Sequence, residues 1–242
     1  MRMRKKKNGA KRLEQCSEYL YERTAEPVCD PGAEIGMPKA PVFLEIGAGK
    51  GGFACGMAKR HSDTAYFAME RVTDCVVIAA EGAKREGGLN NLRFIVDTAD
   101  NLTSIFAPCS VDAIFLNFSD PWSKKGYAKR RLTHERYLAV YFNLLKDGGA
   151  LRFKTDNVDL FDFSLESVKN MGLECSKLTR DLHSSEYNEG NIMTEYERAF
   201  SSEGVAINML EVVKPDGFMP SIDPELMPGG RARFFVNNEQ SE

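Results

Sequence analysis

Residues 42–52 read VFLEIGAGKGG, and they are the most informative segment for predicting the fold. Residues 42–46 have the length and apolar character of a buried strand, and the glycines that follow predict a tight turn. Helical periodicity then runs from Phe53 to Arg60. A strand, a glycine turn and a helix in this order are typical of the first unit of a cofactor-binding α/β fold. We therefore expect the main domain to begin at Val42 and to hold a ligand at this turn.

The rest of the chain continues to alternate between strand and helix patterns. The expected strands cover residues 65–70, 92–96, 111–118, 150–154, 173–178 and 205–213, and the expected helices cover 73–86, 134–146 and 158–171, with a short helix near Thr194. Strands joined by helices pair in parallel, and the helices then cover both faces of the sheet. The sequence predicts an α/β fold with a mostly parallel sheet.

The length of 242 residues and the hydrophobic fraction of 43% suit a single core. Residues 1–41 are expected to form a basic N-terminal arm with a polar helix over residues 8–23. Residues 42–213 are expected to form the one domain. Residues 214–242 are rich in proline and polar side chains, which predicts a loosely ordered tail.

Positive charge is concentrated although the net charge is -3. Residues 1–12 and 124–131 are rich in Lys and Arg and contain no Asp or Glu, so the remainder of the chain is strongly acidic. A basic run by itself is more often a solvated loop. Two such runs in an otherwise acidic chain favour a protein that binds a polyanion at one face.

The six cysteines are far apart in the sequence and form no C-x-x-C motif, so we expect free thiols and no metal site. The three histidines lie in unrelated segments, and we expect structural roles for them. No apolar stretch reaches the length of a membrane span, and no signal peptide follows the basic N-terminus. These features predict a cytoplasmic protein that does not bind membranes.

Two acids beside the glycine turn help to identify the cofactor. The glycines satisfy both G-x-G-x-G and the dinucleotide pattern G-x-G-x-x-G. A dinucleotide would bring a pyrophosphate to this turn, where Glu45 would repel it. S-adenosylmethionine instead brings a cationic amino group and a sulfonium, which Glu45 would attract. Glu70, at the end of the second strand, can accept hydrogen bonds from the ribose hydroxyls of either cofactor. The acids favour S-adenosylmethionine.

A second polar stretch, NFSDPWSKK at residues 117–125, follows the fourth strand. Pro121 ends the sheet pairing, so Asp120 lies just beyond the strand tip, where ligands collect in open α/β sheets. Trp122 is interpreted as a packing residue beneath the loop, with stacking on a base as the alternative. The basic run at residues 124–131 is thereby joined to the expected site.

These motifs resemble those of bacterial tRNA (guanine-N(7))-methyltransferases. The similar segments are, in order, MRMR at 1–4, E-x-G-x-G-K-G at 45–51, Glu70, NFSDPW at 117–122, KRRL at 129–132, KTDN at 154–157 and TEYE at 194–197. The resemblance implies a three-layer, Rossmann-like class I methyltransferase with a seven-stranded sheet whose last strand is antiparallel. It also implies methyl transfer from S-adenosylmethionine to N(7) of a guanine in the tRNA variable loop, by a monomer or homodimer.

The resemblance also assigns roles to individual residues. The implied cofactor contacts are Glu45, Gly47, Gly49, Gly51, Glu70, Asp97, Thr98 and Asp120, with Asp120 also the expected catalytic residue. The implied substrate contacts are Lys124, Asp156, Thr194, Glu195, Tyr196 and Glu197, and the implied RNA contacts are Gly126, Tyr127, Lys129, Arg130 and Arg131. The family usually has Asp-Ala after the third strand. Here Thr98 holds that register and Asp97 comes one residue early, so either can meet the adenine.

The chemistry of this reaction suits the residues present. Guanine N(7) carries an in-plane lone pair, so no general base is required, and catalysis depends on alignment and on electrostatics. Asp120 or Asp156 can hydrogen-bond the guanine N–H edge or stabilise the positive charge that forms on the base. The alternatives are another RNA methyltransferase of the same fold, a nicotinamide-dependent enzyme, and a non-catalytic RNA-binding module with a vestigial pocket. Glu45 disfavours the nicotinamide-dependent enzyme, and the complete set of glycines disfavours the non-catalytic module.

Overall fold

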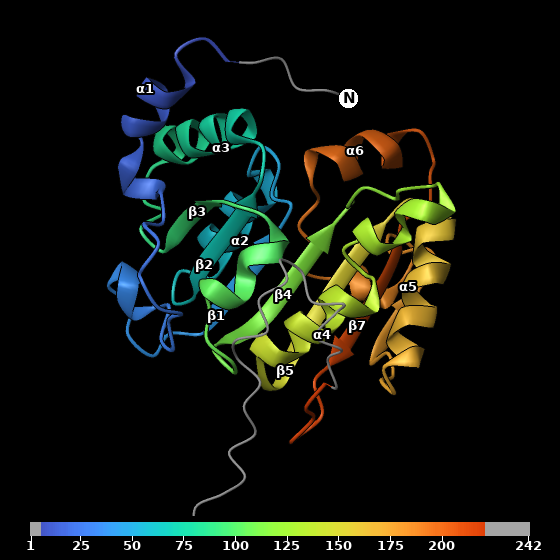
Figure 1. Cartoon of the computed structure of the whole chain (residues 1–242). Coiled ribbons are helices and arrows are strands. Elements are labelled where there is room, and N and C mark those ends of the chain that lie inside the picture. Colours follow the sequence, from blue (N-terminus) through green and yellow to red (C-terminus); the bar gives the residue numbers. More distant parts are fainter. Residues whose placement is uncertain (1–5, 221–242) are drawn as a thin grey trace, which may run out of the picture.

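A computed structural model of the chain describes residues 6–220 (Figure 1). It contains one sheet of seven strands, β1 (Val42–Ile46), β2 (Ala65–Glu70), β3 (Leu92–Val96), β4 (Val111–Asn117), β5 (Leu145–Thr155), β6 (Lys177–Thr179) and β7 (Asn208–Val213). The strand order is β3-β2-β1-β4-β5-β7-β6. Strands β1 to β5 pair in parallel, and β7 runs antiparallel to β5 and β6. The predicted fold class is confirmed.

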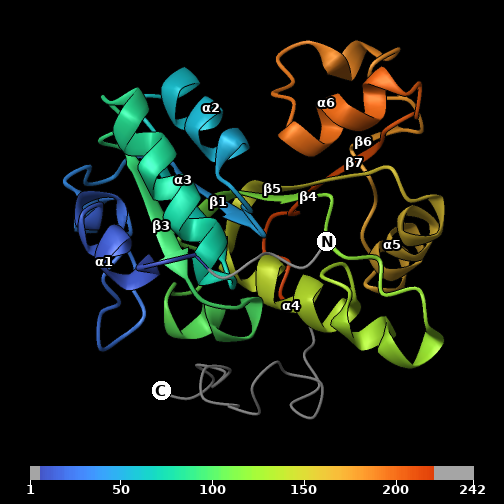
Figure 2. The ribbon, with the colours of Figure 1, turned by 90° about the horizontal axis from the view of Figure 1, so that it is seen from above.

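Helices cover both faces of the sheet, as Figure 2 shows. The helices are α1 (Gly9–Glu14), α2 (Gly52–Arg60), α3 (Thr73–Glu86), α4 (Glu135–Leu144), α5 (Val158–Asn170) and α6 (Glu195–Ser202). Helices α2 and α3 enclose one apolar core with residues such as Tyr66 and Phe94, while α4 and α5 enclose the other with residues such as Ile114 and Phe153. Because five parallel strands end at one edge, their polar tips lie together there.

Helix α2 approaches the sheet closely because of Gly51. A Cβ atom at Gly51 would lie 2.8 Å from the Cβ of Ala79 and 3.0 Å from the ring of Phe94. Its φ of +78° is also a conformation that residues with side chains rarely adopt. Gly51 therefore joins the turn to α2 and lets α2 pack against α3 and β3.

Five expected elements differ from the structure by two residues or more. The strand expected at residues 150–154 is β5, which already begins at Leu145, and the strand expected at residues 205–213 is β7, which begins only at Asn208. The polar helix expected over residues 8–23 is reduced to α1 and a single 3-10 turn (Ser17–Tyr19), because Tyr21 then donates its N–H to Phe94 and the chain runs beside β3. The helix expected over residues 134–146 ends at Leu144, because Leu145 already pairs with Val111 in the sheet. The strand expected at residues 173–178 is confined to β6, whose three residues pair with β7.

The two ends of the chain are only partly described. The basic residues Arg2, Arg4 and Lys5 and the tail residues 221–242 lie outside the described residues. Within residues 214–220, the side chain of Lys214 is 1% exposed and Phe218 contacts the ring of Phe142 edge-on at 5.9 Å. The proposed division at residue 213 remains a prediction. In residues 6–220 no helix has the length and apolar character needed to cross a membrane, and all six cysteines are free thiols.

Candidate active site

The glycine turn after β1 is open at the sheet edge. Gly47 and Gly49 have φ values of +85° and +55°, and a Cβ atom on either would meet nothing within 4 Å. Because glycine adopts these conformations without strain and has no side chain, a ligand can approach the backbone of the turn closely. The N–H groups of Gly47, Gly49 and Gly51 themselves donate to the carbonyl of Met69, to Glu70 and to the carbonyl of Ala48. The space beside the two glycines is where the sequence places the cofactor.

Glu70, at the tip of β2, holds this turn. Its Oε2 accepts the N–H of Gly49 at 3.0 Å, and its Oε1 accepts the N–H of Val72 at 2.8 Å. The side chain remains half-buried. Each carboxylate oxygen has a second lone pair, so Glu70 can still accept hydrogen bonds from hydroxyl groups of a ligand beside the glycine turn.

Glu45 lies in β1, directly below the turn, and is 2% exposed. Its Oε1 accepts a hydrogen bond of 3.0 Å from the side-chain amide of Asn117, at the tip of β4. Its Oε2 is buried and has no hydrogen-bond partner among residues 6–220. Burial raises the pKa of Glu45 to about 7, against the opposing effects of Asn117 and the nearby Lys154 ammonium. A buried oxygen without a partner marks a place for a cationic or hydrogen-bonding ligand group.

The two candidates for the adenine contact follow β3. Asp97 is already engaged, since its Oδ1 accepts the Thr98 N–H at 2.7 Å and the Asn101 amide at 2.6 Å. Its Oδ2 lies 3.6 Å from the guanidinium of Arg23. Asp97 and Thr98 are both half-buried, so the choice between them remains a prediction.

Asp120 lies beyond the tip of β4, and its side chain is 68% exposed. Its nearest ionic partner is Arg71, whose Nη2 lies 3.5 Å from Oδ2. Arg71 directly follows Glu70, so the contact places Asp120 across from the tip of β2. The expected catalytic acid is therefore on the sheet edge with the cofactor candidates, although solvent surrounds it.

The basic loop divides into one inward and one outward arginine. Arg131 donates to the carbonyls of Pro121 at 2.9 Å and Trp122 at 3.3 Å, which fixes the loop. The guanidinium of Arg130 lies over the rings of Trp122 at 5.0 Å and Tyr127 at 4.7 Å and is exposed. Trp122 thus packs against the loop, as expected, and orients an exposed cation. Of the other predicted contacts here, Lys124, Gly126, Tyr127 and Lys129 are all exposed.

Helix α6 is attached to the sheet by a buried carboxylate. Glu197 is 0% exposed and accepts hydrogen bonds from Lys154 at 2.6 Å, from Asn191 at 2.7 Å and from Thr194 in the capping box at 3.3 Å. The Nε2 atom of His183 lies 2.9 Å from Oε1 of Glu197. Burial opposes ionisation, but the Lys154 ammonium and these hydrogen bonds together lower the pKa of Glu197. A substrate could reach Glu197 only by displacing one of these partners.

The remaining predicted substrate residues lie around the start of α6. Thr194 caps the helix, and Glu195 pairs with Lys50 of the glycine turn at 3.1 Å. Tyr196 is 47% exposed and stacks on Phe200 with ring centroids 4.3 Å apart. Asp156, half-buried after β5, is close enough to Tyr196 to raise the pKa of its hydroxyl, although burial contributes more. The Lys50–Glu195 pair thus places the start of α6 beside the glycine turn.

Sequence reasoning assigned no role in this site to four residues, Asn117, Lys154, His183 and Asn191, although Asn117 and Lys154 lie in the quoted motifs. Lys154 and Asn191 both bind Glu197. His183, for which a structural role was expected, bridges Glu197 and Ser201. Asn117, which orients Glu45, was noted only as part of a motif. A buried lysine gives no periodic signal of its own, so only the preceding strand pattern could have suggested that Lys154 points inward.

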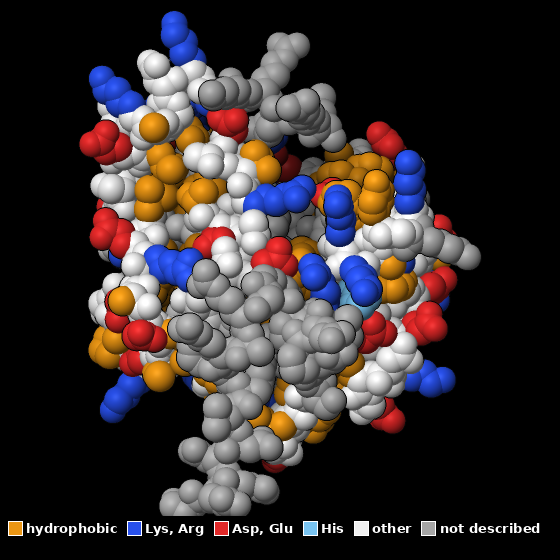
Figure 3. All heavy atoms as spheres, in the orientation of Figure 1, with side chains coloured by type: hydrophobic (Ala, Val, Ile, Leu, Met, Phe, Trp, Pro, Cys, Tyr) orange, Lys and Arg blue, Asp and Glu red, His pale blue; other side chains and the backbone are white. Residues whose placement is uncertain are grey.

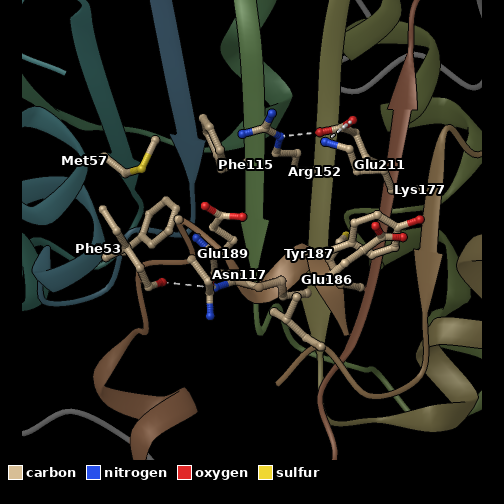
Figure 4. Close-up of a pocket in the computed structure, with 16 residues that line it drawn as sticks. Phe53, Met57, Phe115, Asn117, Arg152, Lys177, Glu186, Tyr187, Glu189 and Glu211 are labelled. Carbon is tan, nitrogen blue, oxygen red and sulfur yellow. Dashed lines mark hydrogen bonds and ion pairs between the residues drawn. The ribbon is translucent and has the colours of Figure 1, made fainter. Parts of the chain in front are cut away.

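A cavity of about 340 Å³ adjoins this network on the face of the sheet that carries α2 (Figure 4). Phe53 and Met57 of α2 face Arg152, Lys177 and Glu211 of the strands across it, and residues 182–192 form a further wall. Asn117 and Lys154 belong to its lining, whereas Glu70, Asp97, Asp120 and Asp156 do not. The cavity therefore lies beside the strand tips rather than at them.

Positive charge gathers on the same side of the molecule. Figure 3 shows several Lys and Arg side chains around a hollow near the tip of β4, below α6. The exposed basic residues that belong to the surrounding elements are Lys50, Arg71, Lys124, Lys129 and Arg130. Among residues 6–220, no group of three or more His, Cys, Asp or Glu side chains could hold a metal ion. The absence of a metal remains a prediction.

Comparison with known proteins gives consistent results. Residues 39–210 match a family model described as "Putative methyltransferase". The chain is 48% identical over 170 residues to the tRNA (guanine-N(7)-)-methyltransferase of Lachnoclostridium phytofermentans, covering 70% of this chain and 79% of that protein. It is 41% identical over 221 residues to the Mesoplasma florum enzyme of the same name, covering 88% and 99%. A solved "antibiotic related Methyltransferase" is 18% identical with a TM-score of 0.57, covers 78% and 95%, and indicates the fold alone.

Proposed function

The chain belongs to the family of tRNA (guanine-N(7)-)-methyltransferases, and we propose that it methylates N(7) of a guanine in the tRNA variable loop. The methyl donor is S-adenosylmethionine. The product is 7-methylguanosine within the tRNA. The reaction takes place in the cytoplasm, where the tRNA is.

The observation that carries this proposal is the unpartnered buried oxygen of Glu45 below the glycine turn. S-adenosylmethionine carries an amino group and a sulfonium, both cationic, and no phosphate. An ionised carboxylate under the turn attracts these groups and repels the pyrophosphate of a nicotinamide dinucleotide. The open space at Gly47 and Gly49 admits a ligand beside that carboxylate. The residues present therefore fit this cofactor.

We assign the cofactor to the sheet edge from β1 to β4. Gly47 and Gly49 would hold its amino-acid part above Glu45, and Gly51 would contribute by joining the turn to α2. Glu70 accepts hydrogen bonds from the ribose hydroxyls, with the lone pairs that Gly49 and Val72 leave free. Either Asp97 or Thr98 contacts the adenine, and Asp120 closes the site from β4.

The bound cofactor supplies an electrophilic methyl group on sulfur. The guanine supplies its own N(7) lone pair, so the protein removes no proton before the transfer. Its contribution is to align the base and to stabilise the positive charge that forms on it. Asp120 and Asp156 supply negative charge on either side of the space below α6. Lys124, Thr194, Glu195 and Tyr196 hold the guanine and its nucleotide, and Glu197 acts from beneath by holding α6.

The RNA is held by the basic loop. Gly126, Tyr127, Lys129 and Arg130 are exposed beside the site and bind phosphates or neighbouring bases. Arg131 keeps the loop in shape through the carbonyls of Pro121 and Trp122. This arrangement explains why an acidic protein can bind a polyanion.

The test is incubation of the purified protein with labelled S-adenosylmethionine and unmodified tRNA transcript, followed by nucleoside analysis. We expect label in 7-methylguanosine alone. A matched transcript in which 7-deazaguanosine replaces guanosine lacks the attacking nitrogen and should take up none. Label in another nucleoside would indicate a different RNA methyltransferase, and tRNA binding without any label would indicate a non-catalytic binding module. Binding of NAD in place of S-adenosylmethionine would overturn the cofactor assignment.

A further inference from the structure

One buried lysine lies between the two carboxylates that underlie the site. Lys154 is in β5, and its side chain is 8% exposed. Its ammonium donates to Glu197 at 2.6 Å, to the side chain of Asn191 at 2.9 Å and to the carbonyl of Ile192 at 3.1 Å. These three acceptors use all three protons of the ammonium group. All three acceptors belong to α6 or to the segment that leads into it.

Lys154 is also linked to Glu45, through Asn117. Lys154 pairs in register with Asn117 of β4, and Asn117 donates to Glu45. The Lys154 charge also acts directly on Glu45 and favours its ionised form. The groups that face Glu45 from the elements around it are Asn117 of β4, Lys154 of β5, Glu70 and Tyr66 of β2, and Cys55 of α2. Of these only Lys154 carries a positive charge.

We propose that Lys154 is a positioning residue that serves both halves of the site, holding α6 through Glu197 and placing a positive charge beside the Asn117–Glu45 pair. The inference rests on the proposed function, because it treats Glu45 as the cofactor side and α6 as the substrate side. Its consequence is that removal of one side chain weakens two separate binding events. Cofactor binding weakens through Glu45, and guanine binding weakens through the displacement of Tyr196 and its neighbours on α6.

The experiment compares Lys154→Met, the double variant Lys154→Met with Glu197→Gln, and Lys214→Met. Lys154→Met alone leaves Glu197 ionised and buried, which endangers folding. The double variant has no unpaired buried charge beneath α6, and its glutamine can still bond with Asn191 and His183. Lys214 is a matched control, since its side chain is 1% exposed and its ammonium bonds to the carbonyl of Leu145, remote from the strand tips. It reports the general effect of removing a buried ammonium.

The first measurement is the affinity for S-adenosylmethionine by calorimetry at about pH 6, 7 and 8. In the parent and in Lys214→Met, affinity should increase with pH as Glu45 ionises, since its pKa lies at about 7. In the double variant the same increase should occur at higher pH, because the positive neighbour of Glu45 is gone. A lysine that served only to stabilise the fold would lower the melting temperature and leave this profile at the parental position.

The second measurement is the rate of tRNA methylation with cofactor saturating. The KM for tRNA should increase about 5- to 150-fold in the double variant, the usual range for coupled sites, with a smaller change in kcat. Lys214→Met should keep the parental KM. A double variant with both the parental pH profile and the parental KM would overturn the inference. If the parent itself bound no S-adenosylmethionine or methylated no tRNA, the proposed function would fail instead, so the two failures are distinguishable.

Discussion

Two buried carboxylates, one under each half of the site, have opposite electrostatic environments. Glu197 has four partners, including the Lys154 ammonium, and these lower its pKa although burial opposes them. Glu45 has one amide donor and one unpartnered oxygen, and burial raises its pKa to about 7. Both side chains are almost inaccessible to solvent. Burial alone therefore does not indicate what a carboxylate does.

The number of hydrogen-bond partners distinguishes a buried carboxylate that positions an element from one that can bind a ligand. A buried charge whose lone pairs are all used contributes to the position of an element, as Glu197 does for α6. A buried charge that lacks partners is unfavourable until a ligand supplies them, and such groups concentrate at functional sites. Both carboxylates were predicted to contact ligands from the sequence. Both contacts remain predictions: Glu45 keeps one oxygen without a partner among the described residues, whereas both oxygens of Glu197 are bonded within the protein.

The largest expected effect is that of Glu197→Ala on stability. The substitution leaves the Lys154 ammonium buried without a carboxylate, and breaking such a pair lowers the free energy of unfolding by about 3–5 kcal/mol. Urea denaturation measures this. Glu195→Ala is the control on the same helix, because the exposed Glu195–Lys50 pair is worth only about 0–1 kcal/mol. Equal losses in the two variants would show that Lys154 finds another partner.

Glu45→Gln should act in the opposite direction on stability. The pKa of Glu45 is raised from 4.5 to about 7, so the folded protein binds this proton more tightly than the unfolded chain does. The contribution of Glu45 to the free energy of unfolding is therefore greatest at low pH. It decreases as the pH rises from the pKa of Glu45 in the unfolded chain to its pKa in the folded protein. At about 1.4 kcal/mol per pH unit, the loss above the folded pKa is at most about 3 kcal/mol.

Replacement by glutamine removes that loss while keeping an acceptor for Asn117. Denaturation should show a stabilised variant at about pH 8 and little change at about pH 4.5, and calorimetry should show weaker cofactor binding. Destabilisation by Glu45→Gln at the higher pH would mean that the free oxygen of Glu45 has a partner in solution, and the contrast with Glu197 would disappear.

Glu70 is an intermediate case, half-buried with one backbone donor on each oxygen. We expect Glu70→Ala to weaken S-adenosylmethionine binding by about 1–3 kcal/mol, the range for losing hydrogen bonds to a charged group. Isothermal calorimetry measures the affinity, and a thermal melt shows whether the variant remains folded. A folded Glu70→Ala protein with parental affinity would remove Glu70 from the cofactor site.

The smallest effects concern the basic loop. There Arg131 is bonded within the protein, as Glu197 is, whereas Arg130 is exposed and available to a ligand. Exposed Lys129 and Arg130 should bind phosphates, so replacing both by Ala should reduce the log–log salt slope of tRNA binding by about 0.7–0.9 for each phosphate that is no longer neutralised. Arg131→Ala should leave the slope unchanged, since its guanidinium bonds to Pro121 and Trp122 carbonyls. Salt titrations of tRNA affinity decide this. A reduced slope for Arg131→Ala alone would reverse the two roles.

The fold class, the limits of most elements and the glycine turn could all be predicted from the sequence. The sequence places β1, β2 and β3 correctly because a short, almost continuous apolar run bounded by turn residues is a local signal. Helix α3 begins and ends at the expected residues because its helical periodicity is also local. The extents of β6 and of the first helix could not be predicted, because they depend on pairing with residues 211 and 94, far along the chain.

Which buried polar side chains have hydrogen-bond partners depends on the tertiary structure. Motif spacing brings Glu45, Glu70 and Asp120 to one sheet edge, but it does not show that Glu45 retains an unpartnered oxygen. Nor does it show that Lys154 bonds to Glu197 and pairs in register with Asn117, the residue that donates to Glu45. Lys154 and Glu197 are 43 residues apart and meet at 2.6 Å because β7 returns antiparallel beside β5 and carries α6 with it. Hydrogen-bond satisfaction is a property of such long-range contacts, whereas periodicity is a property of neighbours.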